Sequence, residues 1–189
     1  SLLNSKNPDN PNVAKFEQAR LVTNLADVFQ SCGGNTDIVK HLFIMVKYLA
    51  LSTVGLAFTL RDHDILGKCV MLGQRYCTTS LSLSLSECIR ALAQNKDNKY
   101  ALGSCGAYKV MANVVRYAVD SANVKLLEEA LMTVSSMVRG SCFNQGLFGS
   151  AGICQMLAKL IEEGSCSGVS VEEKALWCIS LLARSDIAA

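Results

Sequence analysis

The sequence predicts an all-α protein built from similar helical units. Three observations support this fold class. Apolar residues recur every three or four positions along most of the 189-residue chain, which is the spacing of one helix face. Glycine and asparagine residues interrupt these runs where helices would end and begin. Two stretches in the C-terminal half also repeat one pattern at a separation of 45 to 46 residues.

Composition and charge exclude several classes of protein. Half of the residues are apolar and only 18% are charged, so the chain is not expected to be disordered. The net charge of +2, from 18 basic and 16 acidic residues, is too balanced to favour nucleic-acid binding. The nine cysteines are odd in number and lack zinc-binding spacing. We therefore expect no disulfide framework, metal or cofactor, and a cytoplasmic location, with the nucleus as the alternative.

The N-terminal residues predict a tail followed by a helix. Residues 1–12 are rich in Asn, Ser and Pro, and are expected to be a flexible tail ahead of a single domain, 13–189. Whether this domain is a fragment of a longer array stays open. A helix is predicted over 13–30, and the glycines of 32–34 are expected to end it. The Asn-Thr-Asp sequence at 35–37 is typical of the start of the next helix.

A very apolar helix is predicted over 38–51. Because its residues are apolar almost all round, we expect it at the centre of the core, with His41 at the core edge. The apolar run over 42–60 contains Lys47 and is about long enough to span a membrane. A charged residue in mid-span is costly, so the run is interpreted as two buried segments joined by a turn.

Short helices are predicted for the chain after residue 61. The first two cover 62–76 and 83–94. Residues 80–86 alternate Ser and Leu as a strand would, but a lone strand has no partner for its backbone groups, so a loop leading into a helix is expected. His63 lies between two aspartates and is interpreted as part of a helix start, with a metal ligand or general base as the alternative.

Two units of the sequence are similar to each other. Residues 98–111 match 144–157, sharing an Asn, a Gly-Ser pair and a further Gly. Residues 129–139 match 174–184, with one residue gained or lost in the loop between. Each unit is interpreted as a short helix, a glycine turn, a second helix, a loop and a longer third helix. The glycine-rich turns resemble phosphate-binding loops only superficially, since no strand precedes them.

This unit resembles the armadillo repeat. The resemblance rests on an Asn-x7-Gly pattern, at Asn98–Gly106 and Asn144–Gly152, and on the run Ala-Leu-Trp-Cys-Ile-Ser-Leu-Leu-Ala over 175–183. In that family the glycine opens the second helix, and the third helix lines a concave groove. The resemblance therefore implies a right-handed α-α superhelix, an armadillo-like solenoid of three to four repeats. It is clear over 98–184, weaker over 61–94 and only general over 13–60.

The tryptophan–asparagine ladder of nuclear-import adaptors is missing. Armadillo proteins that bind basic nuclear-localisation peptides carry a Trp on the third helix and an Asn four residues later. Trp177 matches the first of these, but residue 181 is Leu. The corresponding pairs upstream are Met132 with Ser136 and Arg90 with Gln94. A role as an import adaptor is therefore kept only as a lesser alternative.

One groove feature does recur, since an arginine follows seven residues after Met132 and again after Trp177. Residues spaced by four and seven share one helix face. The groove is therefore predicted to contain two similar rows, extended upstream by a third: Met132, Ser136 and Arg139; Trp177, Leu181 and Arg184; Arg90 and Gln94. Arginine pairs with carboxylates, and Trp or Met supplies an apolar anchor, so an acidic or mixed extended segment is expected there. Alternatively, these arginines only interact with the carbonyls at a helix end.

The predicted function is non-enzymatic: a scaffold that binds a partner protein along the concave third-helix groove. The alternative is a docking domain for a folded partner from a cytoskeletal or small-GTPase pathway. Membrane association is a lesser alternative, and so is a helical enzyme around His63. Self-association through an uncapped end of the solenoid stays open. So does phosphorylation of the serine-rich segments 80–86 and 164–170.

Overall fold

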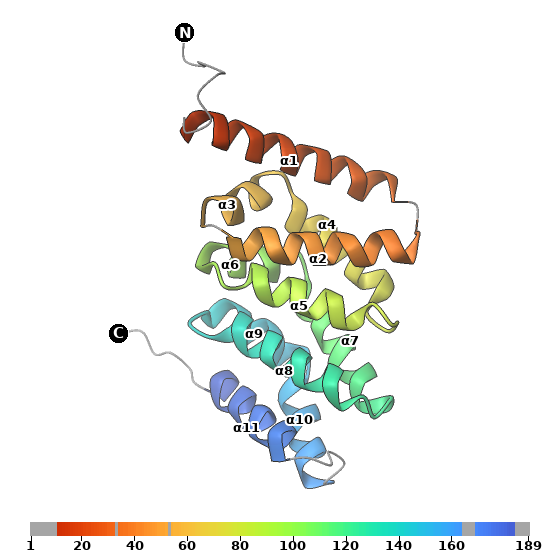
Figure 1. Ribbon diagram of the computed structural model, residues 1–189. Coiled ribbons are helices and arrows are strands. Elements are labelled where there is room, and N and C mark those ends of the chain that lie inside the picture. Colours follow the sequence, from red (N-terminus) through yellow and green to blue (C-terminus); the bar gives the residue numbers. More distant parts are fainter. Residues whose placement is uncertain (1–10, 33, 53, 164–168, 184–189) are drawn as a thin grey trace, which may run out of the picture.

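The chain is described by a computed structural model over residues 11–32, 34–52, 54–163 and 169–183 (Figure 1). These residues form helices and no strand, which confirms the all-α fold class. The helices are α1 (Pro11–Ser31), α2 (Thr36–Ser52), α3 (Val54–Asp62), α4 (Ile65–Tyr76), α5 (Ser82–Leu92), α6 (Lys96–Ser104), α7 (Ala107–Asp120), α8 (Val124–Val138), α9 (Cys142–Ser150), α10 (Ile153–Glu162) and α11 (Val169–Ala183).

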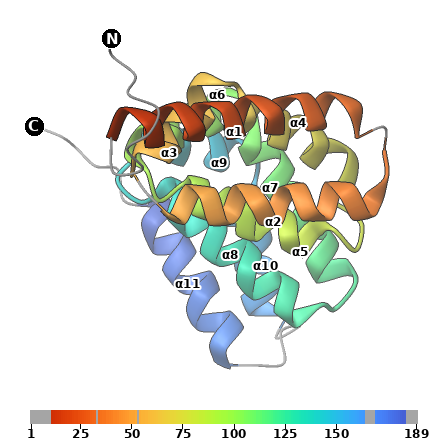
Figure 2. The same cartoon turned by 45° about the horizontal axis from the view of Figure 1, so that its top comes forward.

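The helices are stacked in chain order along one direction (Figure 1). Helices α2, α5, α8 and α11, here called the front helices, contact one another in that order. The two helices that precede each of the last three front helices lie behind it, so α3–α5, α6–α8 and α9–α11 form three-helix layers. Helix α1 covers the first end of the stack and contacts α2, α3 and α4. In Figure 2 the axes of the front helices turn progressively from α2 to α11.

A left-handed backbone residue begins the second helix of each layer. Gly106 and Gly152 have φ angles of 90° and 76° before α7 and α10. Asp64 has a φ angle of 56° at the same place before α4. Aspartate tolerates this conformation better than most residues, though less well than glycine. The turn therefore persists in the first layer without its glycine, which explains why the sequence repeat is faint there.

The turn around His63 differs from the predicted helix start. Helix α3 ends at Asp62, and His63 lies in the turn before α4. Asp64 does occupy the N-cap position, but its side chain makes no capping hydrogen bond. Its carboxylate instead lies 3.8 Å from Lys68 Nζ. Asparagine and serine provide side-chain caps at four other helices: Asn35, Asn95, Asn123 and Ser141. The cap predicted at 35–37 is confirmed, since Asn35 Oδ1 accepts from the Asp37 N–H at 3.0 Å.

The N-terminal helices differ from their prediction in two respects. Helix α1 begins at Pro11, so residues 11–12 belong to a helix and not to the predicted tail. Proline fits the first helical turn because its missing N–H has no partner there in any case. Residues 1–10 lie outside the described residues. Helix α2 was expected to be buried all round, but its core residues lie along one side only. Its opposite side exposes apolar side chains, namely Ile38, Met45, Tyr48 and Leu51.

This partial burial follows from the position of α2 as the first of the front helices in the described chain, where α1 alone precedes it (Figure 1). His41 is exposed as well, with Nδ1 2.7 Å from the carbonyl oxygen of Asp37, and does not lie at the core edge. The apolar run 42–60 is divided between α2 and α3. Within the described ranges, no helix is both long and apolar enough to cross a bilayer.

A buried asparagine joins the second layer to the third. Asn144 of α9 is fully buried, and its Nδ2 donates to the carbonyls of Lys99 at 2.9 Å and Met137 at 3.0 Å. Its side chain lies against Gly103 of α6. Asn98, the matching residue of the second layer, is also fully buried. A buried amide must be hydrogen-bonded to offset its desolvation, so Asn144 fixes how α9 sits on α6 and α8.

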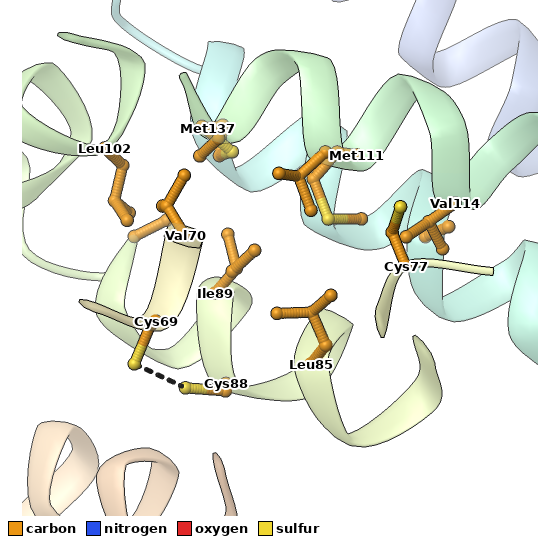
Figure 3. Packing of buried hydrophobic residues seen from close by; sticks show 14 of the residues in the cluster. Cys69, Val70, Cys77, Leu85, Cys88, Ile89, Leu102, Met111, Val114 and Met137 are labelled. Atoms are coloured by element: carbon orange, nitrogen blue, oxygen red, sulfur yellow. Dashed lines mark hydrogen bonds between the residues drawn. The ribbon is translucent and has the colours of Figure 1, made fainter. Parts of the chain in front are cut away.

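The cysteines of the core behave as small apolar residues. Cys69 of α4 and Cys88 of α5 point toward each other, with 3.9 Å between their sulfur atoms, among Val70, Leu85 and Ile89 (Figure 3). Burial raises the pKa of Cys69, and it raises the pKa of Cys178 to about 12. Among the described residues, no group of His, Cys, Asp and Glu side chains is placed to hold a metal ion.

The exposed cysteines are expected to react faster than the buried cysteines. Cys105 and Cys142 are exposed and should react within minutes with a disulfide reagent in the native protein at pH 8. Cys69, Cys88 and Cys178 should react only after unfolding, because their burial excludes the reagent. Burial also suppresses thiolate formation at Cys69 and Cys178. Labelling followed by peptide mass mapping measures this. Equal labelling of Cys142 and Cys178 in the native state would contradict the packing.

A matched pair of glycine substitutions tests the joint at Asn144. A Cβ at Gly103 would overlap Asn144 Oδ1 and lie 3.0 Å from the Phe143 ring, whereas a Cβ at Gly149 would meet nothing within 4 Å. Gly103→Ala should therefore lower the free energy of unfolding by about 1–3 kcal/mol, as overpacking does. Gly149→Ala should raise it by up to about 1 kcal/mol, since alanine favours a helix. Urea unfolding measures the free energy of unfolding of both variants. Equal losses of stability would contradict the close packing of Asn144 against Gly103.

Candidate functional site

The surface formed by the front helices carries a regular set of ion pairs. Each front helix is joined to the next by one pair, and these are Lys47–Glu87 at 2.9 Å, Arg90–Glu129 at 2.6 Å and Lys174–Glu128 at 3.2 Å. The pairs are partly shielded from solvent, so they are screened less by salt than fully exposed charges. These six charges are therefore neutralised within the chain.

Arg90 is a member of these pairs and not an open groove residue. Its Nε donates to Glu129 Oε1, and the Glu129 side chain is only 13% exposed. Burial raises the pKa of Glu129, while the hydrogen bond and the charge of Arg90 act in the opposite direction. The arginine therefore compensates a carboxylate that is already partly desolvated. The Nε–H of Arg90 is therefore already used within the chain.

The burial pattern also changes which residues of α5 correspond to the predicted groove residues of α8. The fully buried positions of the last three front helices match at a spacing of 45 residues, as Cys88, Thr133 and Cys178 show. At this spacing Glu87, not Arg90, corresponds to Met132, and Gln94 corresponds to Arg139. Gln94 is exposed just beyond the end of α5. The predicted rows place Arg90 level with Met132, 42 residues later, because the first layer lacks the glycine that marks the turn in the other two.

A groove between α8 and α11 contains four of the predicted residues. Met132, Ser136, Arg139 and Trp177 line a cavity of about 230 Å³ together with Ser135 and Lys174. Met132 is 38% exposed and Trp177 is 47% exposed, so both side chains present apolar surface to a partner. Arg139 Cζ lies 5.8 Å from the centroid of the Trp177 ring, within the range of a cation–π interaction.

The Arg139 guanidinium is available to an external anion. Within the described part of the chain, it has no carboxylate partner at salt-bridge distance. The backbone carbonyl of Arg139 accepts a hydrogen bond from Lys99 Nζ at 2.9 Å, which anchors the end of α8. Burial lowers the pKa of Lys99, and the nearby charge of Arg139 acts in the same direction. The groove is thus cationic at the end of α8 and apolar beside it.

Two predicted residues do not join this groove. Leu181 is only 5% exposed and lies in the core, where its carbonyl accepts from Gln145 Nε2 at 3.1 Å. Arg184 lies outside the described residues. Lys174 was missed by the sequence analysis, although it lies three residues before Trp177 on the same helix. Its partner, Glu128 of α8, could not be inferred from sequence because their pairing depends on how α8 and α11 pack.

The comparisons with known proteins inform the fold alone. The chain matches no family model and no curated protein. Among solved structures, it is similar to the crystal structure of an engineered protein, with a TM-score of 0.68 and 15% sequence identity. The match covers 85% of this chain and 62% of that protein, so the chain spans about three-fifths of its length. Together with the helices described above, this similarity defines the chain as an all-α protein of packed helices.

Replacing Arg90 is expected to destabilise the protein in a pH-dependent way. Arg90→Met leaves the Glu129 carboxylate partly buried without its partner, which should cost about 1–3 kcal/mol at pH 7. The pKa of Glu129 is already raised, so protonation on acidification removes the unpaired charge. The destabilisation should therefore shrink as the pH falls toward 4.5, the ordinary value for this carboxyl group. Urea unfolding from pH 4 to pH 8 measures this.

Lys125→Met, an exposed change on the same helix α8, is the control and should have little effect at any pH. A loss in Arg90→Met that stays constant across the pH range would mean that Glu129 is not the group responsible.

Proposed function

We propose that this chain is a non-enzymatic scaffold with an armadillo-like, right-handed superhelical fold, and that it binds an acidic or mixed extended segment of a partner protein. The observation that carries the proposal is the Arg139 guanidinium, which lies beside the exposed Trp177 ring and has no carboxylate partner within the described residues. Three ion pairs within the chain occupy other charges of the same surface. An open cation beside apolar surface favours a ligand with a carboxylate next to an apolar side chain.

Three features support the armadillo-like assignment. The last three front helices share fully buried positions at a spacing of 45 residues, as at Cys88, Thr133 and Cys178. Each second helix begins at a left-handed residue. The axes of the front helices turn progressively along the stack (Figure 2). A stack of this kind presents an extended surface with many shallow contacts, which suits an extended peptide better than catalysis, since catalysis requires a closed site.

The groove contributes three kinds of contact to such a ligand. Arg139 would donate paired hydrogen bonds to an Asp or Glu side chain. Trp177 and Met132 would cover an adjacent apolar side chain, and aromatic residues of this kind are frequent centres of binding energy. Ser136 would contact the ligand from the middle of the groove. Because these groups come from two neighbouring layers, binding also depends on how α8 and α11 pack.

Peptide titrations test the proposal directly. Trp177 is the single tryptophan of the chain, so its emission reports on the groove. Synthetic ten-residue peptides that alternate Glu with Leu or Phe should shift this emission saturably, whereas the same peptides with Lys in place of Glu should not. Arg139→Glu should weaken binding at least tenfold, because attraction becomes repulsion. Arg116→Glu, an exposed change on α7, is the control of matched charge and should bind normally.

Equal affinity of the Arg139→Glu variant for the acidic peptides would contradict the proposed site, as would equal binding of acidic and basic peptides. Binding of a folded partner protein that survives Arg139→Glu would favour the alternative role as a docking domain with an interface elsewhere.

A further inference from the structure

A second cavity lies next to the groove, where the chain leaves α8. Its volume is about 420 Å³. The residues that line it are Arg61, Lys96, Asp97, Tyr100, Gly140 and Ser141. Gly140 and Ser141 directly follow Arg139, whose side chain lines the groove. Because Cα atoms two residues apart lie at most about 7.6 Å from each other, the two cavities are neighbours.

An exposed tyrosine lines this second cavity and rests on an aromatic ring of the next layer. Tyr100 of α6 is 61% exposed, and its ring centroid lies 4.6 Å from that of Phe143 of α9. The Phe143 ring fixes the position of Tyr100 but leaves most of the Tyr100 side chain uncovered. Aromatic side chains held in this way cover an apolar group of a ligand at a low cost in conformational entropy.

A lysine beside Tyr100 is available to a negatively charged group. Lys96 lies four residues before Tyr100, on the same face of α6. It is exposed, and within the described ranges no carboxylate lies at salt-bridge distance from its ammonium group. Arg61 differs, since Asp62 and Asp97 lie 3.7 Å and 3.9 Å from its guanidinium. Lys96 is therefore the cation of this cavity with which a ligand can pair.

Further positive charge lies at the end of α8, beside both cavities. Lys99 Nζ donates to the Arg139 carbonyl at 2.9 Å, and burial together with the charge of Arg139 lowers the pKa of Lys99. Neither side chain has a carboxylate partner among the residues that the structure describes. Two cations that repel each other without a counter-ion favour a ligand that brings negative charge to this point. A segment that runs from the groove into the second cavity passes it.

The groove and the second cavity offer the same chemistry at the same contact between layers. In the groove, Arg139 of the second layer lies beside Trp177 of the third. In the second cavity, Lys96 lies beside Tyr100, which packs on Phe143 of the third layer. Each site combines an aromatic ring with a cation that lacks a carboxylate partner in the described chain. Two such neighbouring sites suit two similar elements of one ligand.

We propose that the partner segment bound in the groove continues past Arg139 into the second cavity. There an apolar or aromatic side chain of the segment covers Tyr100, and a neighbouring Asp or Glu pairs with Lys96. This inference rests on the proposed function and specifies its ligand, which carries two acidic–apolar elements in one extended stretch. Joining the two elements strengthens binding, because the first contact holds the second element at a high local concentration.

Peptide length tests this inference. A ten-residue peptide that alternates Glu with Phe spans about 33 Å when extended, and a five-residue peptide of the same pattern spans about 16 Å. The shorter peptide covers little more than the groove, since residues 132–139 extend over about 10 Å of α8. The ten-residue peptide should bind at least about tenfold more tightly. Titration of the Trp177 emission measures both affinities, because this residue lies in the groove.

Two variants locate the added affinity in the second cavity. Tyr100→Ser and Lys96→Glu should each weaken binding of the ten-residue peptide at least about fivefold, with little effect on the five-residue peptide. The matched controls are Tyr48→Ser, which removes a tyrosine that is 65% exposed on α2, and Lys40→Glu, an exposed change on the same helix. Both controls should bind both peptides normally. Circular dichroism checks that each variant keeps its helices.

The outcomes separate this inference from the function on which it rests. A ten-residue peptide that gains no affinity over the five-residue peptide would overturn the role of the second cavity and leave the groove in place. A gain that survives both Tyr100→Ser and Lys96→Glu would do the same. If neither peptide binds, the proposed function fails and this inference fails with it.

Discussion

Each three-helix layer of this protein can bury its apolar sides only against its neighbours. This constraint determines at which positions of a layer apolar residues are needed. Front helix α8 is covered by α5 on one side and by α11 on the other, so apolar residues occupy both of its flanks. The buried Asn144 then sets how one layer sits on the next, because its two hydrogen bonds reach two different helices. The close approach of Asn144 to Gly103 and the hydrogen bonds of Asn144 thus act at the same contact between the second and third layers.

The groove depends on the same packing. Ion pairs join neighbouring front helices and neutralise six of the charged side chains on this surface. Arg139 differs because it follows the end of α8, where no acidic residue of α11 faces it within the described residues. Its position beside Trp177 is a property of two layers together. A change in the packing of α11 would therefore move the cation and the aromatic ring apart without altering either residue.

Much of the fold could be predicted from the sequence, and less of the site. The units over 98–184 were recognisable because glycine and asparagine have strict local roles at helix ends. The first layer was harder, since Asp64 adopts the left-handed turn without a glycine to mark it. Spacing alone brought Met132, Arg139 and Trp177 together correctly. It could not show that Leu181 is buried or that Arg90 is paired with Glu129, because both depend on contacts between layers.

The position of the single tryptophan affects how unfolding of this protein is observed. Trp177 lies on α11, in the last of the described layers, and among the described residues this layer is packed against a neighbouring layer on one side only. Its emission therefore reports the release of that layer, whereas circular dichroism averages over every helix. In a stack held together by nearest-neighbour contacts, the two signals need not change at the same denaturant concentration. Coincident transitions would indicate that the layers unfold as one cooperative unit.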